Sequence, residues 1–382
     1  MIYLDNSATT KPYPEVLESY RTVAETFFAN PSSVHGKGGE AERLLKQARQ
    51  IAADLLHVQA KEIVFTSGGT EGDNLAVKGI AFYYRSRGKH LITTEMEHPA
   101  VSEAFRQLEE LGFEVTYLPA KQDGRVSVSD LEKAIREDTT LVSMIHVNNE
   151  LGSVQPVEEA GRLLKKYPKI QFHVDHVQGV TKVPLDLIGA GIDLCAISGH
   201  KFHGPRGTGL LYVREGANLM PLMSGGAQES GVRAGTENLA GVVAMVKALR
   251  ISSETGANGV ARMWKLNTML REGLQEVEDV VVNTPKKNAA PHIVNFSVGG
   301  IKPEVLIHAL EEREIYLSTR SACSSKQEGA SPILLAAGIP QKRAETALRI
   351  SLSFQNSEED IIETIKAIKE IVPSLRKVRE KV

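Results

Sequence analysis

Apolar residues recur along the first two-thirds of the chain in two alternating patterns. From Gly39 to His57 they lie three or four positions apart, which is the spacing of one buried face of an α-helix. Short apolar runs that are typical of buried strands occur at 62–65, 90–93, 113–118, 141–147, 171–175, 193–198 and 209–213. Helical spacing returns between several of them, over 71–87, 100–111, 129–137 and 156–167. Strands that alternate with helices predict an α/β fold with a mostly parallel, helix-covered sheet.

The pattern changes after about residue 236. A long helical stretch runs from Glu237 towards Val277, with a weak polar and glycine-containing break at 255–259 that could act as a hinge. Beyond it, short apolar runs at 280–282, 293–298, 315–317 and 349–354 alternate with helical patterns near 303–313 and 358–370. We therefore predict a large domain over residues 15–254 and a smaller α+β domain formed by residues 1–14 and 255–382.

Charge and composition narrow the class of protein. The chain has 45 Lys and Arg residues against 47 Asp and Glu residues, a net charge of −2, which gives no overall attraction to nucleic acid or to an anionic membrane. No apolar stretch approaches the roughly 20 residues that span a bilayer, and the first residues lack the pattern of a signal peptide. Two cysteines, Cys195 and Cys323, are too few for a disulfide framework. We therefore expect a cytoplasmic protein that does not bind nucleic acid directly.

Polar residues and glycines follow the predicted strands, where an open α/β sheet binds its ligands. Residues 66–71 form a glycine turn that enters a helix; its N–H groups could bind an anion, although such a turn is also an ordinary connection. His98 and the Asn148-Asn149 pair follow later strands. Besides binding a ligand, His98 could simply cap a helix, and the two asparagines could simply form a turn. Asp175 ends an apolar strand, where a carboxylate needs a cation or a hydrogen-bond donor.

The segment 198–207 places Lys201 between His200 and His203 and next to glycines. A lysine amine that is desolvated or close to other cations forms Schiff bases. Two histidines near Asp175 also allow a metal site, but no clustered Cys/His or H-E-x-x-H pattern accompanies them, and we expect no metal. An anion cradle, a carboxylate and a reactive lysine at successive strand ends match the phosphate, ring nitrogen and aldehyde of pyridoxal 5′-phosphate.

The chain closely resembles the cysteine desulfurases of the iron–sulfur-cluster type, a branch of the class V aminotransferase superfamily with the fold-type I arrangement. The resemblance extends over essentially the whole length. It rests on residues 3–10, 30–35, 65–74, 97–98, 146–152, 174–179, 198–209, 233–238, 321–325 and 348–351. It implies a pyridoxal-phosphate enzyme that converts L-cysteine to L-alanine and passes the sulfur to an acceptor protein.

The resemblance also implies roles for individual residues. Lys201 is expected to bind the aldehyde of the cofactor, Asp175 to pair with its ring nitrogen, and His98 to stack on the ring and take part in proton transfer. Asn149 and Arg349 resemble the clamp for the substrate carboxylate, for which the planar fork of an arginine is suited. The other residues implied as cofactor ligands are Gly69, Thr70, Asn149, Gln178, Ser198, His200 and Thr236.

Thr236 and Cys323 imply how the enzyme is assembled and how it carries sulfur. Thr236 resembles a phosphate ligand that the neighbouring subunit donates, which implies a homodimer. Cys323 resembles the catalytic cysteine that becomes a persulfide, and the positive charges of Arg320 and Lys326 should favour its thiolate. Cys195 fits the ordinary reading of a free cysteine as a small buried hydrophobic residue.

Alternative functions stay open from the sequence. A selenocysteine lyase and a plain class V aminotransferase are the nearest enzymes, and Cys323 argues against the second. A non-catalytic platform that docks sulfur acceptors is a different class, against which Lys201 and Asp175 argue. The acceptor itself could be an iron–sulfur cluster scaffold, a tRNA-thiolating enzyme or a carrier of the thiamine pathway. Arg320 stands where related proteins often have glycine, which bears on this choice.

Overall fold

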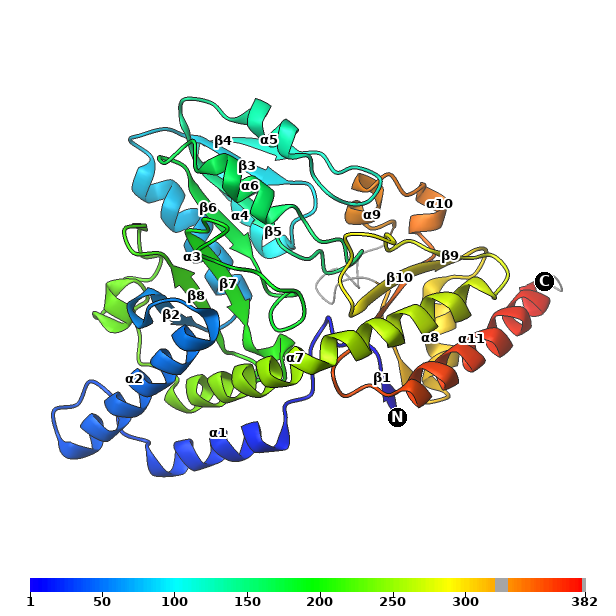
Figure 1. The fold of residues 1–382 in the computed structure, drawn as a ribbon, viewed down its shortest axis with the longest axis horizontal. Coiled ribbons are helices and arrows are strands. Elements are labelled where there is room, and N and C mark those ends of the chain that lie inside the picture. Colours follow the sequence, from blue (N-terminus) through cyan, green and yellow to red (C-terminus); the bar gives the residue numbers. More distant parts are fainter. Residues whose placement is uncertain (320–328, 380–382) are drawn as a thin grey trace.

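The computed structural model describes residues 1–319 and 329–379, and its centre is a seven-stranded sheet (Figure 1). The strands lie in the order β2 (Ile63–Thr66), β8 (Gly209–Val213), β7 (Leu194–Ser198), β6 (Gln171–Asp175), β5 (Thr139–Ile145), β3 (His90–Thr94) and β4 (Glu114–Leu118). The strands from β7 to β4 are parallel, whereas β8 is antiparallel to both β2 and β7. The predicted α/β fold with a mostly parallel sheet is confirmed.

Helices cover both faces of this sheet. One face carries α3 (Gly69–Tyr84) and α4 (Pro99–Glu110); the other carries α1 (Pro14–Thr26), α2 (Gly36–Leu56), α5 (Val128–Ala134), α6 (Val157–Leu164) and the first half of α7 (Leu239–Gln275). Successive strand residues point to opposite faces, so Leu141 joins the first layer and Val142 joins the second. Burial on both faces explains why the strands appear in the sequence as continuous apolar runs.

A smaller part of the molecule combines the first residues of the chain with its last third (Figure 1). Leu4 lies in the hydrophobic core of this part, so the two ends of the sequence pack together. Its strands form an antiparallel sheet of β12 (Ala347–Ser351), β10 (Ile293–Val298) and β9 (Val280–Val282), and a parallel pair of β1 (Ile2–Tyr3) and β11 (Ile315–Tyr316). Its other helices are α8 (Pro303–Glu311), α9 (Pro332–Ala336), α10 (Gln341–Ala344) and α11 (Glu358–Arg379).

Helix α7 joins the two parts, with its first half in one core and its second half in the other. The break predicted at 255–259 is wrong, because the helix continues through it. The glycines there allow close packing instead: a β-carbon on Gly256 would lie 2.5 Å from the carbonyl oxygen of Thr181. The predicted domain boundary after residue 254 falls inside this helix, and the division into two domains stays a prediction.

Two N-terminal elements have no counterpart in the sequence prediction. Helix α1 buries only Val16 and Val23, which are too few to produce a clear helical pattern. Strand β1 is two residues long and exists because β11 lies beside it.

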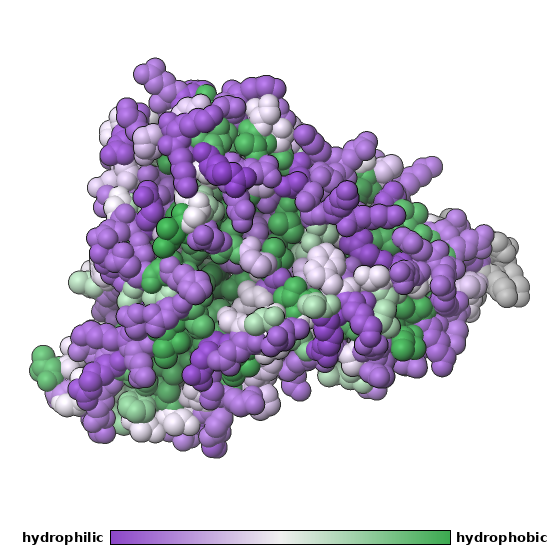
Figure 2. Space-filling model, viewed as in Figure 1, coloured by the Kyte–Doolittle hydropathy of each residue, from purple (hydrophilic) through white to green (hydrophobic). Residues whose placement is uncertain are grey.

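The surface is largely polar. On the face shown in Figure 2, hydrophilic side chains predominate and hydrophobic side chains gather mainly left of the centre. Within residues 1–319 and 329–379, no helix is both long and apolar enough to cross a membrane.

Candidate active site

The carboxyl ends of five strands meet along one edge of the central sheet. Strand β2 points the same way as β7, because both are antiparallel to β8. The turns after β2, β3, β5, β6 and β7 therefore converge, as the sequence predicted. They enclose a pocket lined by Ser7, Ala8, Gly69, Thr70, Asp73, His98, Ile145, Asn149, Asp175, Val177, Gln178, Ser198, His200, Lys201 and Arg349.

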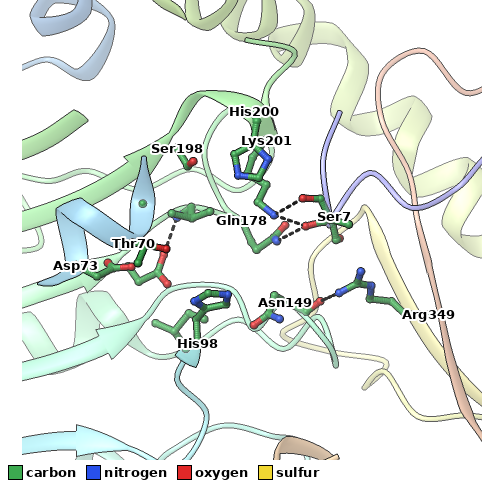
Figure 3. A pocket seen from close by; sticks show the side chains of 15 residues that line it. Ser7, Thr70, Asp73, His98, Asn149, Gln178, Ser198, His200, Lys201 and Arg349 are labelled. Atoms are coloured by element: carbon green, nitrogen blue, oxygen red, sulfur yellow. Dashed lines mark hydrogen bonds between the residues drawn. The ribbon is translucent and has the colours of Figure 1, made fainter. Parts of the chain in front are cut away.

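Lys201 ends a short 3₁₀ turn, η2 (Gly199–Lys201), directly after β7. Its Nζ donates hydrogen bonds to the main-chain oxygens of Ser7 and Ala8, the latter at 2.9 Å. Gln178 Nε2 also donates to the Ser7 oxygen, at 2.9 Å, so the lysine amine and the glutamine amide meet at one point (Figure 3). Ser7 and Ala8 were absent from the predicted site residues, although residues 3–10 formed one of the stretches that carry the resemblance.

His98 approaches the pocket from the side opposite Lys201 (Figure 3). It stands before the first residue of α4, and its Nδ1 accepts a hydrogen bond from the Ala100 N–H at 3.1 Å. The alternative reading of His98 as a helix cap is thus correct, and the same ring also lines the pocket. Burial and the positive charge of Lys201 lower the pKa of His98 to about 4, so the ring is neutral at physiological pH. Its hydrogen then resides on Nε2, since Nδ1 accepts.

Two buried carboxyl groups lie at one end of the pocket. Asp175 ends β6, and its Oδ1 accepts a hydrogen bond from the Val177 N–H at 2.9 Å. Asp73, on α3, was missed from the sequence, although it lies one helical turn after Thr70. Burial raises the pKa of both groups to about 8, and for Asp175 the nearby Asp73 carboxyl contributes to the rise. Among the described residues, Asp73 Oδ1 has no hydrogen-bond partner, so this end of the pocket offers a cationic ligand two carboxyl groups whose ionised form that ligand would stabilise.

The start of helix α3 forms an anion cradle. Free N–H groups at a helix start favour a phosphate, and the hydroxyl-bearing residues Thr70 and Ser198 line the same pocket. Gly69 cannot be replaced without disturbance, because a β-carbon there would lie 2.7 Å from the side chain of Val177. Burial and the Lys201 charge lower the pKa of His200 to about 3, so this ring is also neutral.

Arg349 enters the pocket from β12 of the smaller part, opposite Thr70 (Figure 3). Its side chain is buried; Nη1 donates to the Asn149 main-chain oxygen at 2.7 Å, and Nη2 pairs with Asp5 Oδ1 at 2.9 Å. Among the described residues, the Nε of Arg349 and the Oδ1 of Asn149 have no hydrogen-bond partner. The structure therefore brings Asn149 and Arg349 together, with unused polar atoms on both.

Of the two remaining predicted residues, one lies outside this pocket and the other lies outside the described residues. Thr236 is exposed and lies beside a separate depression of the same chain, with Phe65 and Glu229 among its lining residues. Cys323 lies outside the described residues. Cys195 is fully buried in β7, as expected for a structural cysteine. In the described part of the chain, no group of three or more His, Cys, Asp or Glu side chains could hold a metal ion.

This pocket fits pyridoxal 5′-phosphate group by group. The helix start and hydroxyl groups suit a phosphate, the two buried carboxyl groups suit a protonated ring nitrogen, and the Lys201 amine, which lines the same pocket, suits an aldehyde. With the sheet order, these features define a fold-type I pyridoxal-phosphate enzyme.

Comparison with known proteins gives the family. Residues 2–363 match the family model described as aminotransferase class-V. A NifS/IcsS protein homolog from Lactobacillus delbrueckii is 45% identical over 99% of both chains, and the cysteine desulfurase IscS from Methanosarcina thermophila is 42% identical over 98% of this chain and 93% of its own. The chain belongs to the class-V aminotransferases and, within them, to the cysteine desulfurases of the NifS and IscS type.

Solved structures agree with this assignment. A NifS-like protein superposes with a TM-score of 0.92 at 37% identity and covers 97% of this chain and 99% of its own. A structure described as SspA in complex with cysteine has a TM-score of 0.79 at 35% identity, over 92% of this chain and 99% of its own.

Proposed function

We propose that this chain is a pyridoxal-phosphate-dependent cysteine desulfurase that converts L-cysteine to L-alanine and stores the sulfur as a persulfide on Cys323. The observation that carries the proposal is the position of the Lys201 amine, between the anion cradle with its two carboxyl groups and the Arg349–Asn149 pair. The cysteine desulfurase relatives and the SspA structure with cysteine support this choice of substrate.

The residues that would hold the cofactor lie on one side of the pocket. The cofactor, when bound, supplies an aldehyde for amino groups and a ring that accepts electron density from the substrate. Gly69, Thr70, Ser198 and His200 would bind its phosphate, and Gln178 its phenolic oxygen. A protonated ring nitrogen beside Asp175 would stabilise the ionised carboxylate and offset the effect of burial on its pKa.

The remaining pocket residues would bind the substrate and move protons. Arg349 and Asn149 would hold the α-carboxylate, which directs the amino group towards Lys201. The Lys201 amine would take up the proton that leaves the substrate α-carbon. The neutral His98 ring would stack on the cofactor and donate from Nε2, because its Nδ1 is engaged in the helix cap.

Sulfur transfer would use Cys323. Its thiolate would attack the substrate sulfur; the S–S bond forms as the bond from sulfur to Cβ breaks, and Cβ gains a proton to give alanine. The persulfide would then pass to an acceptor protein, such as an iron–sulfur cluster scaffold or a thiolation enzyme.

A homodimer with shared sites is part of the proposal. Thr236 is exposed and outside the pocket of its own chain, as a residue that serves a neighbouring subunit would be. Its loop is held by two ion pairs, from Arg233 to Glu71 at 2.8 Å and from Arg49 to Glu229 at 2.6 Å. We place this dimer in the cytoplasm.

The test measures product, covalent sulfur and cofactor linkage together. Purified enzyme is incubated with cysteine or with selenocysteine, and alanine and the mass of the Cys323 peptide are determined. We expect alanine from cysteine, a persulfide on Cys323 and, after borohydride reduction, a pyridoxyl label on Lys201. Alanine from selenocysteine alone would indicate a lyase, and amino-group exchange without sulfur release would indicate an aminotransferase. A label on another lysine would refute the assignment of Lys201.

A further inference from the structure

The turn that carries Lys201 is fixed through its main-chain carbonyl groups. Four of five consecutive carbonyl oxygens, those of Gly199, His200, Phe202 and His203, accept hydrogen bonds from main-chain N–H groups or from hydroxyl groups. The fifth, that of Lys201 itself, accepts a hydrogen bond from the side-chain amine of Lys182 at 2.8 Å. Among these five carbonyl groups, a lysine amine is therefore the donor only at Lys201, the residue proposed to bind the cofactor.

Lys182 is an unusual residue to find at this place. It lies in the segment after β6, where its main-chain N–H donates to the Gly179 oxygen at 3.0 Å, and its exposed fraction is only 5%. Within residues 1–319 and 329–379, no carboxylate lies within ion-pair distance of its amine. Burial and the positive charge of Lys201 lower the pKa of Lys182 to about 7.

The other titratable groups that face Lys182 are histidines. They are His176 after β6, His203 after the turn and His292 before β10, and the charge of Lys182 contributes to the lowered pKa of each. Burial keeps all three rings neutral at physiological pH. They therefore add no positive charge, and a histidine cannot serve as the counter-ion of a lysine. Both ring nitrogens of His292 lack hydrogen-bond partners among the residues that the structure describes. In the described part of the chain, the surroundings of Lys182 therefore contain Lys201 and neutral rings, with no counter-ion.

A purely structural role does not explain a lysine here. Burying an ammonium group without a counter-ion is costly, and the four neighbouring carbonyl groups show that neutral donors are sufficient. A second cation close to an amine makes protonation of that amine less favourable, which is a known way of activating a lysine nucleophile. The charge of Lys201 contributes to the lowered pKa of Lys182, and because the repulsion between two ammonium groups is mutual, a proton on either amine disfavours a proton on the other.

We propose that Lys182 is a positioning residue for Lys201: its hydrogen bond fixes the main chain at Lys201, and its amine adds a second cationic group to the same buried site. The inference rests on the proposed role of Lys201. The unprotonated Lys201 amine is the form that forms the bond to an aldehyde and that takes up a proton from the substrate.

The experiment compares Lys182→Met, which removes donor and charge, with Lys182→Gln, which keeps a donor, and Lys182→Arg, which keeps both. The apo proteins are acetylated at a series of pH values, and the labelling of Lys201 is measured by peptide mass against the exposed Lys302. We expect Lys201 of the wild type to react at lower pH than Lys302. The midpoint should rise by roughly 1 pH unit in the Met and Gln variants and stay unchanged in the Arg variant.

Kinetics and folding complete the test. In the holoenzyme, Lys182→Met should lower kcat for cysteine by roughly 10- to 100-fold with little change in KM, because the substrate clamp is untouched. Circular dichroism and thermal unfolding establish that each variant is folded. Lys182→Arg should restore most of kcat.

The outcomes separate this inference from the proposed function. The inference alone is overturned if folded Lys182→Met shows the same midpoint pH for Lys201 acetylation as the wild type, while the wild type carries the pyridoxyl label on Lys201. If Lys182→Met does not fold, equal midpoints for Lys201 and Lys302 in the wild type overturn it. A wild-type enzyme without a label on Lys201 refutes the proposed function and the inference with it.

Discussion

Asp73 Oδ1 and His173 Nε2 lie 3.4 Å apart beside the pocket, and both side chains are buried. Neither atom has a hydrogen-bond partner in residues 1–319 and 329–379, while His173 Nδ1 contacts Ser143 Oγ at 2.8 Å. Burial raises the pKa of Asp73 to about 8 and lowers the pKa of His173 to about 4. The pair therefore exists at neutral pH as a carboxylic acid and a neutral ring, and an ion pair forms only at a high free-energy cost.

This charge state predicts how Asp73→Asn changes stability with pH. The folded protein keeps a proton on Asp73 that the unfolded chain releases above its ordinary pKa of 3.8. The free energy by which this retained proton favours the folded state is fully present below a pH equal to that pKa, and it is lost as pH rises through about 8. Asparagine cannot ionise, so apo Asp73→Asn should gain stability relative to the wild type by a few kcal/mol between pH 4 and 8.

Urea unfolding of the apo proteins at several pH values measures this difference. Asp54→Asn, which changes an exposed carboxyl group on α2, is the matched control. Its difference in unfolding free energy from the wild type should depend very little on pH. If the difference in unfolding free energy between Asp73→Asn and the wild type were the same at every pH, Asp73 would not be protonated in the folded protein.

Arg349→Lys tests the substrate clamp. The guanidinium group holds the Asn149 main chain and Asp5 simultaneously, and a lysine ammonium cannot reproduce this planar arrangement. We expect KM for cysteine to rise by roughly 10- to 100-fold, while the pyridoxyl label on Lys201 is retained. Arg271→Lys changes a half-buried arginine outside the pocket and should leave KM unchanged. An unchanged KM in Arg349→Lys would remove Arg349 from the clamp.

The proposed action of Thr236 in the neighbouring subunit predicts that two inactive variants restore one active site when they form a mixed dimer. Lys201→Ala and Thr236→Ala chains, each carrying a different tag, are co-expressed, and the mixed dimer is purified through both tags. If Thr236 acts in the neighbouring subunit, one site of this dimer lacks both defects and should recover cofactor binding and alanine formation. Homodimers of each variant are the controls. A mixed dimer no more active than they are would mean that Thr236 does not act across the interface.

The two cysteines are expected to behave differently. Burial raises the pKa of the Cys195 thiol well above its usual value, so this thiol should stay unreactive in the folded protein. Cys195→Ala should keep alanine formation from cysteine, whereas Cys323→Ala should lose it while retaining the cofactor. Peptide mass spectrometry after incubation with cysteine should find persulfide on Cys323 alone. Normal alanine formation by Cys323→Ala would exclude the proposed sulfur transfer.

The Arg49–Glu229 pair predicts a large stability effect. Glu229 has only 2% of its side chain exposed and binds both terminal nitrogens of Arg49, at 2.6 and 2.7 Å. Arg49→Met would leave a buried carboxylate without its cation and should cost about 3–5 kcal/mol in urea unfolding. The matched control is Lys265→Met, in the exposed pair with Glu358, which should cost less than about 1 kcal/mol. If Arg49→Met and Lys265→Met lost the same unfolding free energy, burial would not determine the contribution of these ion pairs.

The sequence predicted the central sheet well because burial on both faces leaves a clear mark. Every predicted run in the large part corresponds to a strand within two residues, for example 171–175 to β6. The pocket could also be anticipated, since the residues after parallel strands must meet at one edge. Asp73 could have been found as well, because it lies one turn after Thr70 on a predicted helix. The prediction failed where local signals are weak, as in α1 and at the glycines inside α7.

The sequence by itself determined the strands, the helices that cover them and most of the residues in the pocket, because these follow from local hydrophobic patterns and from the resemblance to a family. Only the tertiary structure decided the antiparallel place of β8 and the meeting of Ser7, Lys201 and Arg349. It also decided the charge states of His98, Asp73 and Lys182. Burial and neighbouring charges set these states, and both come from segments far apart in the chain, which no local pattern can reveal.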